Sequence, residues 1–366
     1  MNGLYVHIPF CVSKCLYCDF YSLPGRQSGV DSYIGAVLQE AHKYKGEAFR
    51  TLFIGGGTPS LLGAEGLCRL MGGLRGTFRL DKLEEATIEA NPESAGEGFF
   101  RAARSLGFTR VSIGVQSLDD AELKKSGRAH NAVQALGALR SAFESGFTDV
   151  SADIMIGLPG QTLETIKNTL HKIIETGVTH ISAYCLSVED GTPFASDPPD
   201  DLPGDDEQAA LYEFVREALG RSGFIHYEIS NFALPGRECR HNLNYWRGGD
   251  YLGLGPAAAS HIGGKRLKNV PDLDKYLANP LSLPVETDEI DIGAKVGEEA
   301  MLRLRLLQEG LDLDEMAAKF GHENVAALRV KLEALSASGD LIKKGNSYGL
   351  PYDRVLTSNG ILAGVL

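Results

Sequence analysis

The chain alternates between short apolar or β-branched runs and longer segments with helical spacing, and this alternation limits its fold more than any other feature. The apolar runs predict six strands, Leu4–Ile8, Thr51–Gly55, Ala86–Ala90, Arg110–Val115, Val150–Ile156 and His180–Leu186. The segments between and after them predict six helices, Asp31–Tyr44, Ala64–Phe78, Ser94–Leu106, Asn131–Ser145, Leu163–Thr176 and Glu207–Ser222. Strands that alternate with helices form right-handed βαβ units around a parallel sheet. Six such units predict an α/β fold with a barrel or partial barrel.

Glycine, proline and polar residues follow the first five predicted strands. The segments are HIPFC (7–11), GGGTP (55–59), EANPES (89–94), GVQS (114–117) and IGLPGQ (156–161). In a barrel, the loops at the carboxyl ends of the strands carry the active site. Loops of this kind often look alike, but five in succession favour a ligand site on that face.

The chain has 366 residues, which suits one large domain with an appendage. We expect residues 1–225 to form the barrel and 226–296 an extended segment, of which 263–291 crosses the molecule. Residues 297–366 turn helical and end in two short strands around Gly345 and Asn346, which resembles a small winged-helix unit. Residues 298–366 hold ten acidic and eight basic residues, so no basic face for nucleic acid is expected there.

The composition argues against several classes of partner. A net charge of -12 disfavours nucleic acid and anionic membranes. No run of eighteen apolar residues exists, so we expect no integral membrane segment, and the N-terminus lacks the features of a signal peptide. We therefore expect a cytoplasmic protein, where disulfides are rare, and we interpret Cys68 and Cys185 as small buried residues.

Three cysteines, Cys11, Cys15 and Cys18, lie directly behind the first predicted strand with the spacing C-x3-C-x2-C. A structural zinc site takes four ligands, and Cys239 or a histidine would have to supply the fourth. Three unreactive buried cysteines are a further alternative, although the segment is polar and turn-like. A [4Fe–4S] cluster held by three thiolates would leave one iron open to a small molecule.

The motif and its place resemble the radical S-adenosylmethionine (SAM) superfamily. Further segments resemble the oxygen-independent coproporphyrinogen III oxidase group of that superfamily, namely YVHIPFC, GGGTPS, IEANPES, RVSIGVQS, GRAHN, ADIMIGLPGQT and YEISNFA. The resemblance implies a partial (β/α)6 TIM-like barrel, a [4Fe–4S] cluster on the three cysteines, and SAM on the open iron. The aromatic Tyr17 before the third cysteine also fits. The resemblance further implies a SAM site made of Tyr5, Gly56, Gly57, Thr58, Glu89, Gln116, Arg128 and Asp153.

The chemistry of these side chains is compatible with SAM. Glu89 and Asp153 can accept hydrogen bonds from ribose hydroxyls or an ammonium group. Arg128 can pair with a carboxylate, and Gln116 can bridge polar groups. Each of them could instead be a polar loop residue that only satisfies its neighbours, and only the shared register with the family favours the SAM site.

Two departures distinguish the chain from the oxidases. The oxidases resemble C-x3-C-x2-C-x-C, but Phe20 stands at the fourth position here. They also carry a longer N-terminal arm, whereas this sequence starts four residues before Tyr5. Both departures resemble the sister branch of HemW-type haem chaperones, which bind and transfer haem. We therefore expect a haem chaperone with a haem-accepting protein as partner. The alternatives are coproporphyrinogen III oxidase (dehydrogenase) and, less favoured by the acidic charge, a nucleic-acid-modifying radical SAM protein.

The segment HNLNYW, residues 241–246, fits the H-N-x-x-Y-W pattern of that branch. Its resemblance implies that His241 is an axial haem ligand, with Tyr245 and Trp246 stacked on the porphyrin. We expect the segment on a loop-rich stretch dense in glycine, and we expect haem at the rim of the barrel or near the C-terminal unit. Cys239 and His261 are weaker candidates for a haem ligand. In the alternative interpretation, His241 satisfies backbone groups and Trp246 packs under the barrel.

Overall fold

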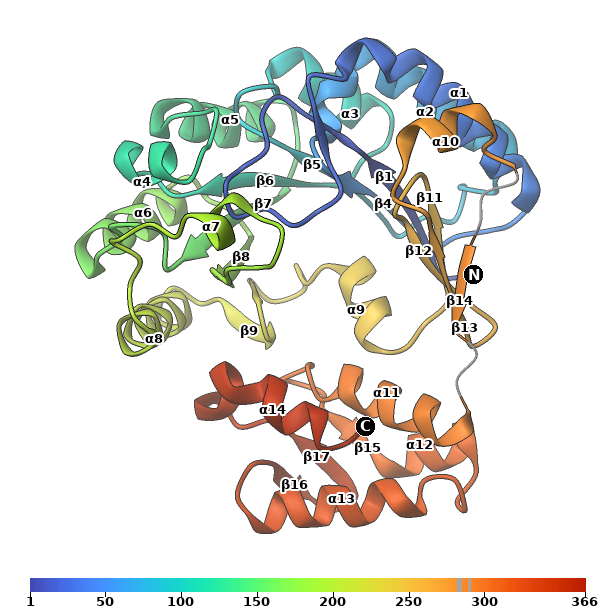
Figure 1. The fold of residues 1–366 in the computed structure, drawn as a ribbon, viewed down its shortest axis with the longest axis vertical. Coiled ribbons are helices and arrows are strands. Elements are labelled where there is room, and N and C mark those ends of the chain that lie inside the picture. The colour runs from blue at the N-terminus through green and yellow to red at the C-terminus, as the bar shows by residue number, and fades with distance from the viewer. Residues whose placement is uncertain (282–284, 289–290) are drawn as a thin grey trace.

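The computed structural model describes residues 1–281, 285–288 and 291–366 (Figure 1). Its central feature is a sheet in which six strands run parallel in the order β1-β4-β5-β6-β7-β8. They are β1 (Gly3–Ile8), β4 (Thr51–Gly56), β5 (Glu85–Ala90), β6 (Arg110–Gln116), β7 (Asp149–Ile156) and β8 (His180–Cys185). The predicted α/β fold with a partial barrel is thus confirmed, and no strand end differs from its prediction by more than one residue.

Helices cover the outer side of this sheet (Figure 1). The long ones are α1 (Val30–Ala41), α2 (Gly63–Thr77), α3 (Glu97–Ser105), α5 (Ala132–Glu144), α6 (Leu163–Glu175) and α8 (Asp205–Arg221). Side-chain caps explain two of the starts, since Asn131 caps α5 and Thr162 caps α6. Helix α3 starts three residues later than predicted, because the backbone N–H groups of Ser94 and Ala95 first close a turn on the Asn91 carbonyl.

Shorter elements connect these units. They are β2 (Phe10–Cys11), β3 (Leu23–Pro24), η1 (Gln27–Gly29), η2 (His42–Tyr44), η3 (Pro59–Leu62), α4 (Asp120–Lys125) and α7 (Pro193–Ser196).

Alternation along the strands separates the core from the barrel interior. Leu4, Val6 and Ile8 of β1 are fully buried among the apolar side chains of the core. Tyr5 and His7 point to the opposite face, because successive side chains of a strand alternate. The polar side chains on this interior face of the barrel form and support the site described below.

The region predicted as an extended segment, 226–296, instead continues the same sheet on both flanks. Strands β10 and β9 follow β8, and strands β11 to β14 follow β1 on the other side. The elements are β9 (Ile225–Glu228), β10 (Asn231–Ala233), α9 (Arg240–Trp246), β11 (Tyr251–Leu254), β12 (Ala259–Ile262), β13 (Lys265–Asn269), α10 (Leu273–Ala278) and β14 (Val285–Asp288). Residues 282–284 and 289–290 of the predicted crossing stretch lie outside the described residues. The domain boundaries at 225 and 296 remain predictions.

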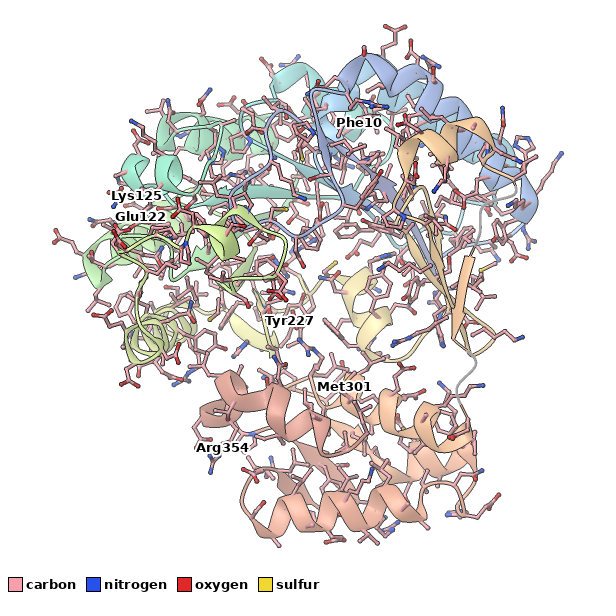
Figure 2. All side chains as sticks on the ribbon, in the orientation of Figure 1. Phe10, Glu122, Lys125, Tyr227, Met301 and Arg354 are labelled. Carbon is pink, nitrogen blue, oxygen red and sulfur yellow. The ribbon has the colours of Figure 1, made fainter. Side chains whose placement is uncertain are left out.

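The C-terminal unit contains the predicted helices and hairpin. Its elements are α11 (Ile292–Arg303), β15 (Leu311–Asp312), α12 (Leu313–Phe320), α13 (Ala326–Ala337), β16 (Ile342–Lys344), β17 (Ser347–Gly349), η4 (Tyr352–Thr357) and α14 (Ser358–Ala363). It joins the barrel directly, since the Leu307 N–H donates to the Tyr227 carbonyl at 3.0 Å. Tyr227 of β9 and Met301 of α11 mark the two sides of this junction in Figure 2. Among the described residues, no helix has the length and apolar character needed to span a membrane.

Candidate functional site

A cavity of about 380 Å³ lies at the carboxyl ends of the parallel strands. Ten of the thirteen predicted site residues line it: Cys11, Cys15, Tyr17, Cys18, Gly56, Gly57, Glu89, Gln116, Arg128 and Asp153. Tyr5, Thr58 and His241 are the three that do not. Residues from four of the five predicted loops therefore share one cavity, whereas no residue of the fifth, 156–161, lines it.

The three motif cysteines share this cavity, and two of them accept hydrogen bonds from its walls. Thr58 donates its hydroxyl to Cys11 Sγ at 3.5 Å, and Arg128 donates Nη1–H to Cys15 Sγ at 3.3 Å. Within the described residues, no three His, Cys, Asp or Glu side chains are placed to hold one metal ion. A four-iron cluster takes one thiolate on each of several irons, so it needs a wider spacing than a single ion. Three thiols in one cavity are the donor set that a cluster with one open iron takes, whereas a structural zinc site takes four ligands.

The surroundings of Cys18 favour its protonated thiol. Burial, together with the neighbouring Cys15 and Cys11, raises the pKa of Cys18 to about 11. A positively charged iron centre would reverse this effect, because a coordinated thiol loses its proton. Cys239 cannot complete a zinc site here, since its Sγ instead contacts Glu85 Oε1 at 3.5 Å in a separate buried cluster.

The glycine loop after β4 packs directly against the segment that leads to Cys11. Gly56 has φ +113°, and a Cβ there would lie 2.6 Å from the ring of His7. A Cβ on Gly57 would lie 2.6 Å from the Phe10 carbonyl oxygen and 3.1 Å from Cys11 Sγ. The glycines therefore serve first to bring two loops together, and they leave backbone at the cavity wall.

Two buried carboxyl groups, Glu89 and Asp153, line the same cavity. The Gly56 N–H donates to Glu89 Oε2 at 3.0 Å, and the Ser112 hydroxyl donates to Asp153 Oδ1 at 2.9 Å. Burial raises the pKa of Glu89 to about 8, and the negative charge of Asp153 adds to the shift. Burial also raises the pKa of Asp153. A cationic ligand would stabilise the ionised form of both groups.

Gln116 and Arg128 are held in unusual ways. Gln116 has φ +65° at an irregularity between β6 and β7, a conformation that non-glycine residues adopt mainly where the surrounding structure enforces it. Arg128 donates Nη2–H to Asn91 Oδ1 at 3.0 Å and to the Gly114 carbonyl at 2.9 Å. Its Nε is buried and has no partner in the part of the chain that the structure describes. This unused donor fits the expectation of an anionic ligand group near Arg128.

Tyr5 and Thr58 support the cavity from behind its wall. The Tyr5 hydroxyl lies 2.9 Å from Nδ1 of His7. The other ring nitrogen of His7, Nε2, lies 2.8 Å from the Tyr21 carbonyl. Thr58 accepts a hydrogen bond from Asn91 Nδ2 at 3.0 Å while it donates to Cys11. Both residues position neighbours of the cavity and do not line it.

The sequence interpretation did not identify Asn91, Ser112 and Tyr184, which also line the cavity. Asn91 belongs to the EANPES segment and Ser112 to RVSIGVQS, so their segments had been found but not their roles. Tyr184 lies on β8 next to Met155 of β7 and is 41% exposed. The signal in the sequence is an aromatic residue near the carboxyl end of the predicted strand His180–Leu186, where the side chains of a barrel site are expected.

The predicted haem ligand His241 lies at the amino-terminal ends of the strands. It is fully buried on α9, where Nδ1 lies 2.8 Å from Thr51 Oγ1 and Nε2 lies 2.8 Å from the Tyr245 hydroxyl. Its ring stacks on Phe53 at a centroid distance of 5.2 Å. Burial lowers its pKa to about 3. Both ring nitrogens of His241 thus contact side-chain hydroxyl groups, whereas the alternative interpretation expected contacts with backbone groups, and the role of His241 as a haem ligand remains a prediction.

Three further expectations need correction. The HNLNYW segment forms a short helix, not a loop, because Glu85 accepts hydrogen bonds from the first backbone N–H groups of α9 at 2.9 and 3.0 Å. Cys239 is buried beside Glu85 and is unsuited to haem. Cys68 is exposed, because its position on α2 falls outside the apolar stripe that begins at Leu67. Cys185 is partly buried against the core.

Comparison with known proteins gives the following matches. Residues 5–173 match the family model of the radical SAM superfamily. A protein of Lactococcus lactis named heme chaperone HemW is 36% identical over 87% of this chain and 85% of its own length. Proteins of the same name from Mycobacterium tuberculosis and Bacillus subtilis are 38% and 34% identical, over 98% and 100% of this chain and 92% and 97% of their own lengths.

Among solved structures, the chain is similar to coproporphyrinogen III oxidase (HemN) from Escherichia coli, described as a radical SAM enzyme. The TM-score is 0.87, with coverage of 100% of this chain and 90% of the other. The identity is 24%, so this likeness concerns the fold alone.

Proposed function

We propose that this chain, which belongs to the HemW family of the radical SAM superfamily, is a haem chaperone that binds haem and passes it to a haem-accepting protein. The observation that carries the proposal is the likeness to proteins named heme chaperone over 87% to 100% of the chain. Phe20, 65% exposed at the cavity, supports it further, because it occupies the position of the fourth cysteine in the oxidase pattern.

In the proposed site, Cys11, Cys15 and Cys18 hold a [4Fe–4S] cluster at the mouth of the barrel. When bound there with SAM, the cluster supplies one-electron chemistry, which belongs to the cofactor and not to the protein. The contacts from Thr58 and Arg128 to two of the sulfurs support this assignment, because hydrogen bonds to cluster sulfurs are among the means by which a protein tunes such centres.

The remaining cavity residues bind and orient SAM in this proposal. Glu89 and Asp153 accept hydrogen bonds from its ammonium or ribose hydroxyls, and Arg128 offers a donor to its carboxylate. Gln116 offers its side-chain amide to SAM, from a backbone conformation with positive φ that the surrounding structure enforces. Tyr17 lines the cavity beside the cysteines and separates them from the apolar group around Phe194, with which its ring has a centroid distance of 6.3 Å.

The proposed partner is a haem-accepting protein whose identity is open, and the proposed compartment is the cytoplasm. All six cysteines are free, which fits a reducing compartment. Neither nucleic acid nor a membrane is part of the proposal.

The test uses the full chain with its cluster reconstituted under anaerobic conditions. Haemin is titrated into the protein and followed by the Soret band, and the loaded protein is then mixed with an apo-haemoprotein of distinct spectrum. We expect a saturable Soret change and transfer of haem to the acceptor. A parallel incubation contains coproporphyrinogen III, SAM and a reductant, and we expect no protoporphyrinogen IX. Decarboxylation without haem binding would favour the oxidase instead.

A further inference from the structure

The fifth predicted loop, residues 156–161, does not line the cavity of the motif cysteines but belongs to a second apolar core. The members of this second core are Met155, Leu158, Leu186 and Phe194, with Leu16, Tyr17 and Leu202 packed against them. Leu158 comes from the fifth loop and is fully buried. Leu16 and Tyr17 lie between the second and third motif cysteines. The second core therefore joins the fifth loop to the segment that carries the three cysteines.

The backbone of Leu16 is hydrogen-bonded on both sides. Its N–H donates to the Ser126 carbonyl at 3.1 Å, and its carbonyl accepts from the Phe194 N–H at 3.0 Å. Gly127 lies against the same residue, because a Cβ there would lie 2.9 Å from Leu16 Cγ. Since Leu16 follows Cys15 directly, these contacts limit where the Cys15 thiol can lie.

Residues 187–204 lie between β8 and α8 and contribute Phe194 and Leu202 to the second core. The fifth loop fixes this connecting segment, since the Gly160 N–H donates to the Asp201 carbonyl at 2.8 Å. Gly160 has φ +75°, a conformation that glycine adopts without strain. The fifth loop, the connecting segment and the cysteine segment are thus held against one another.

The second core also forms a wall of the cavity, because Tyr17, Met155 and Leu186 line it. Phe194 is 2% exposed, and its ring centroid lies 6.3 Å from that of Tyr17. Loss of the Phe194 ring would leave a void beside Tyr17, and closely packed surroundings collapse only in part into such a void. In the described part of the chain the second core is separate from the main apolar core. This void should therefore loosen the cysteine segment and leave the sheet intact.

We infer that the second core holds the cysteine segment in place before any iron is bound, with Phe194 and Leu158 as positioning residues for the [4Fe–4S] cluster. The inference rests on the proposed cluster site and names what supports it. A segment that is already anchored at Leu16 loses less conformational freedom when a cluster assembles on its thiols, and this lowers the cost of assembly. The fifth loop and residues 187–204 then share one role, which is to support the cluster site from outside the cavity.

The first test follows amide hydrogen exchange in the cluster-free full chain by mass spectrometry. The Leu16 amide should be protected in the unmodified chain. Phe194→Ala should accelerate exchange of residues 14–18 by about tenfold or more, because loss of a buried ring costs more than one tenfold factor in stability. Exchange of helix α3, which packs in the main core, should not change.

The matched control is Phe147→Ala, because Phe147 is also 2% exposed but belongs to the main core. It should leave exchange of residues 14–18 unchanged. Leu202→Ala removes a partly buried member of the second core and should act in the same direction as Phe194→Ala, so the test stands even if Phe194→Ala does not fold. Phe194→Leu should retain most of the protection.

The second test measures iron and sulfide content after anaerobic reconstitution, and then the rate of iron loss to a chelator. Phe194→Ala should lose iron about tenfold faster or more, whereas Phe147→Ala should match the unmodified chain. Equal exchange of residues 14–18 in the unmodified chain, Phe194→Ala and Leu202→Ala would overturn the inference and leave the proposed cluster site standing. Failure of the unmodified chain to assemble a cluster would instead overturn the proposed cluster site itself, so the two failures are distinguishable.

Discussion

Glu89→Gln should remove the contribution of Glu89 to the pH dependence of stability in the cluster-free protein. Burial raises the pKa of Glu89 to about 8, whereas a glutamate in an unfolded chain titrates near about 4.3. Between these values the folded protein holds a proton that the unfolded chain releases. The contribution of Glu89 to stability is thus fully present below about pH 4 and is lost as the pH rises through about 8. At about 1.4 kcal/mol per pH unit, the loss amounts to about 4 kcal/mol by pH 7.

Glutamine isolates this effect because it keeps the local contact. Its side-chain oxygen can still accept the hydrogen bond that Gly56 N–H donates at 3.0 Å, but it cannot ionise. Urea unfolding of the two cluster-free proteins at intervals between about pH 5 and pH 8 gives the free energy of unfolding for each. As the pH rises over this range, the free energy of unfolding of Glu89→Gln should increase by several kcal/mol relative to that of the unmodified protein.

The matched control is Glu164→Gln, which changes an exposed carboxyl group at the start of α6 and should keep the slope of the unmodified protein. If the curves of Glu89→Gln and the unmodified protein run parallel with pH, then Glu89 is not protonated in the folded state. The cavity would then supply more stabilisation to the carboxylate than its one backbone donor provides, and the reasoning from burial would be refuted.

Three further outcomes follow from individual contacts. Cys15→Ala should abolish iron and sulfide incorporation, whereas Cys68→Ala should retain both, as measured by metal and sulfide analysis after anaerobic reconstitution; full incorporation in Cys15→Ala would contradict the cluster assignment. Gly57→Ala should displace the glycine loop from the cysteine segment and lower both cluster content and SAM binding. Gly72→Ala is the control, because a Cβ at this position of α2 meets no other atom, and it should stabilise the chain by up to about 1 kcal/mol in urea unfolding. His241→Ala should lower the free energy of unfolding by about 2–4 kcal/mol, because it leaves the Thr51 and Tyr245 hydroxyl groups without this partner and opens a small void. An unchanged unfolding midpoint would refute this structural role.

The parallel strands were predictable because their signal is local. Each interior strand is a short apolar run that ends in glycine or a polar loop, and burial on both faces keeps such a run nearly continuous. The cavity was predictable for a related reason, since residues that follow parallel strands must meet at one edge of the sheet. Gly56, Glu89 and Asp153 therefore lie together although up to 97 positions separate them in the chain.

The place of His241 was not predictable, because long-range contacts determine it. Its ring nitrogens contact Thr51, 190 positions away, and Tyr245, on the next turn of its own helix. The helix itself begins where Glu85, from β5, accepts the backbone N–H groups. The contact with Tyr245 follows the i, i+4 spacing of a helix, but nothing within residues 241–246 indicates the contacts with Thr51 and Glu85. Family resemblance singled out this segment, but only the geometry shows that the His241 ring is enclosed.

A second cavity of about 530 Å³, the junction cavity, lies between the flank of the sheet and the C-terminal unit, at the opposite ends of the strands from the first cavity. Cys11 follows the carboxyl end of β1, whereas Gly3 at its amino end pairs with Tyr251, which lines the junction cavity. A ligand in the junction cavity would therefore contact the C-terminal unit and the flank of the sheet, and it would not need to enter the barrel mouth. Any influence between the two cavities must pass through packed strands such as β1 and β11, and its physical basis would be a change in the arrangement of those strands. Because packed cores switch between discrete arrangements and do not deform gradually, such an influence would need a second arrangement of these strands.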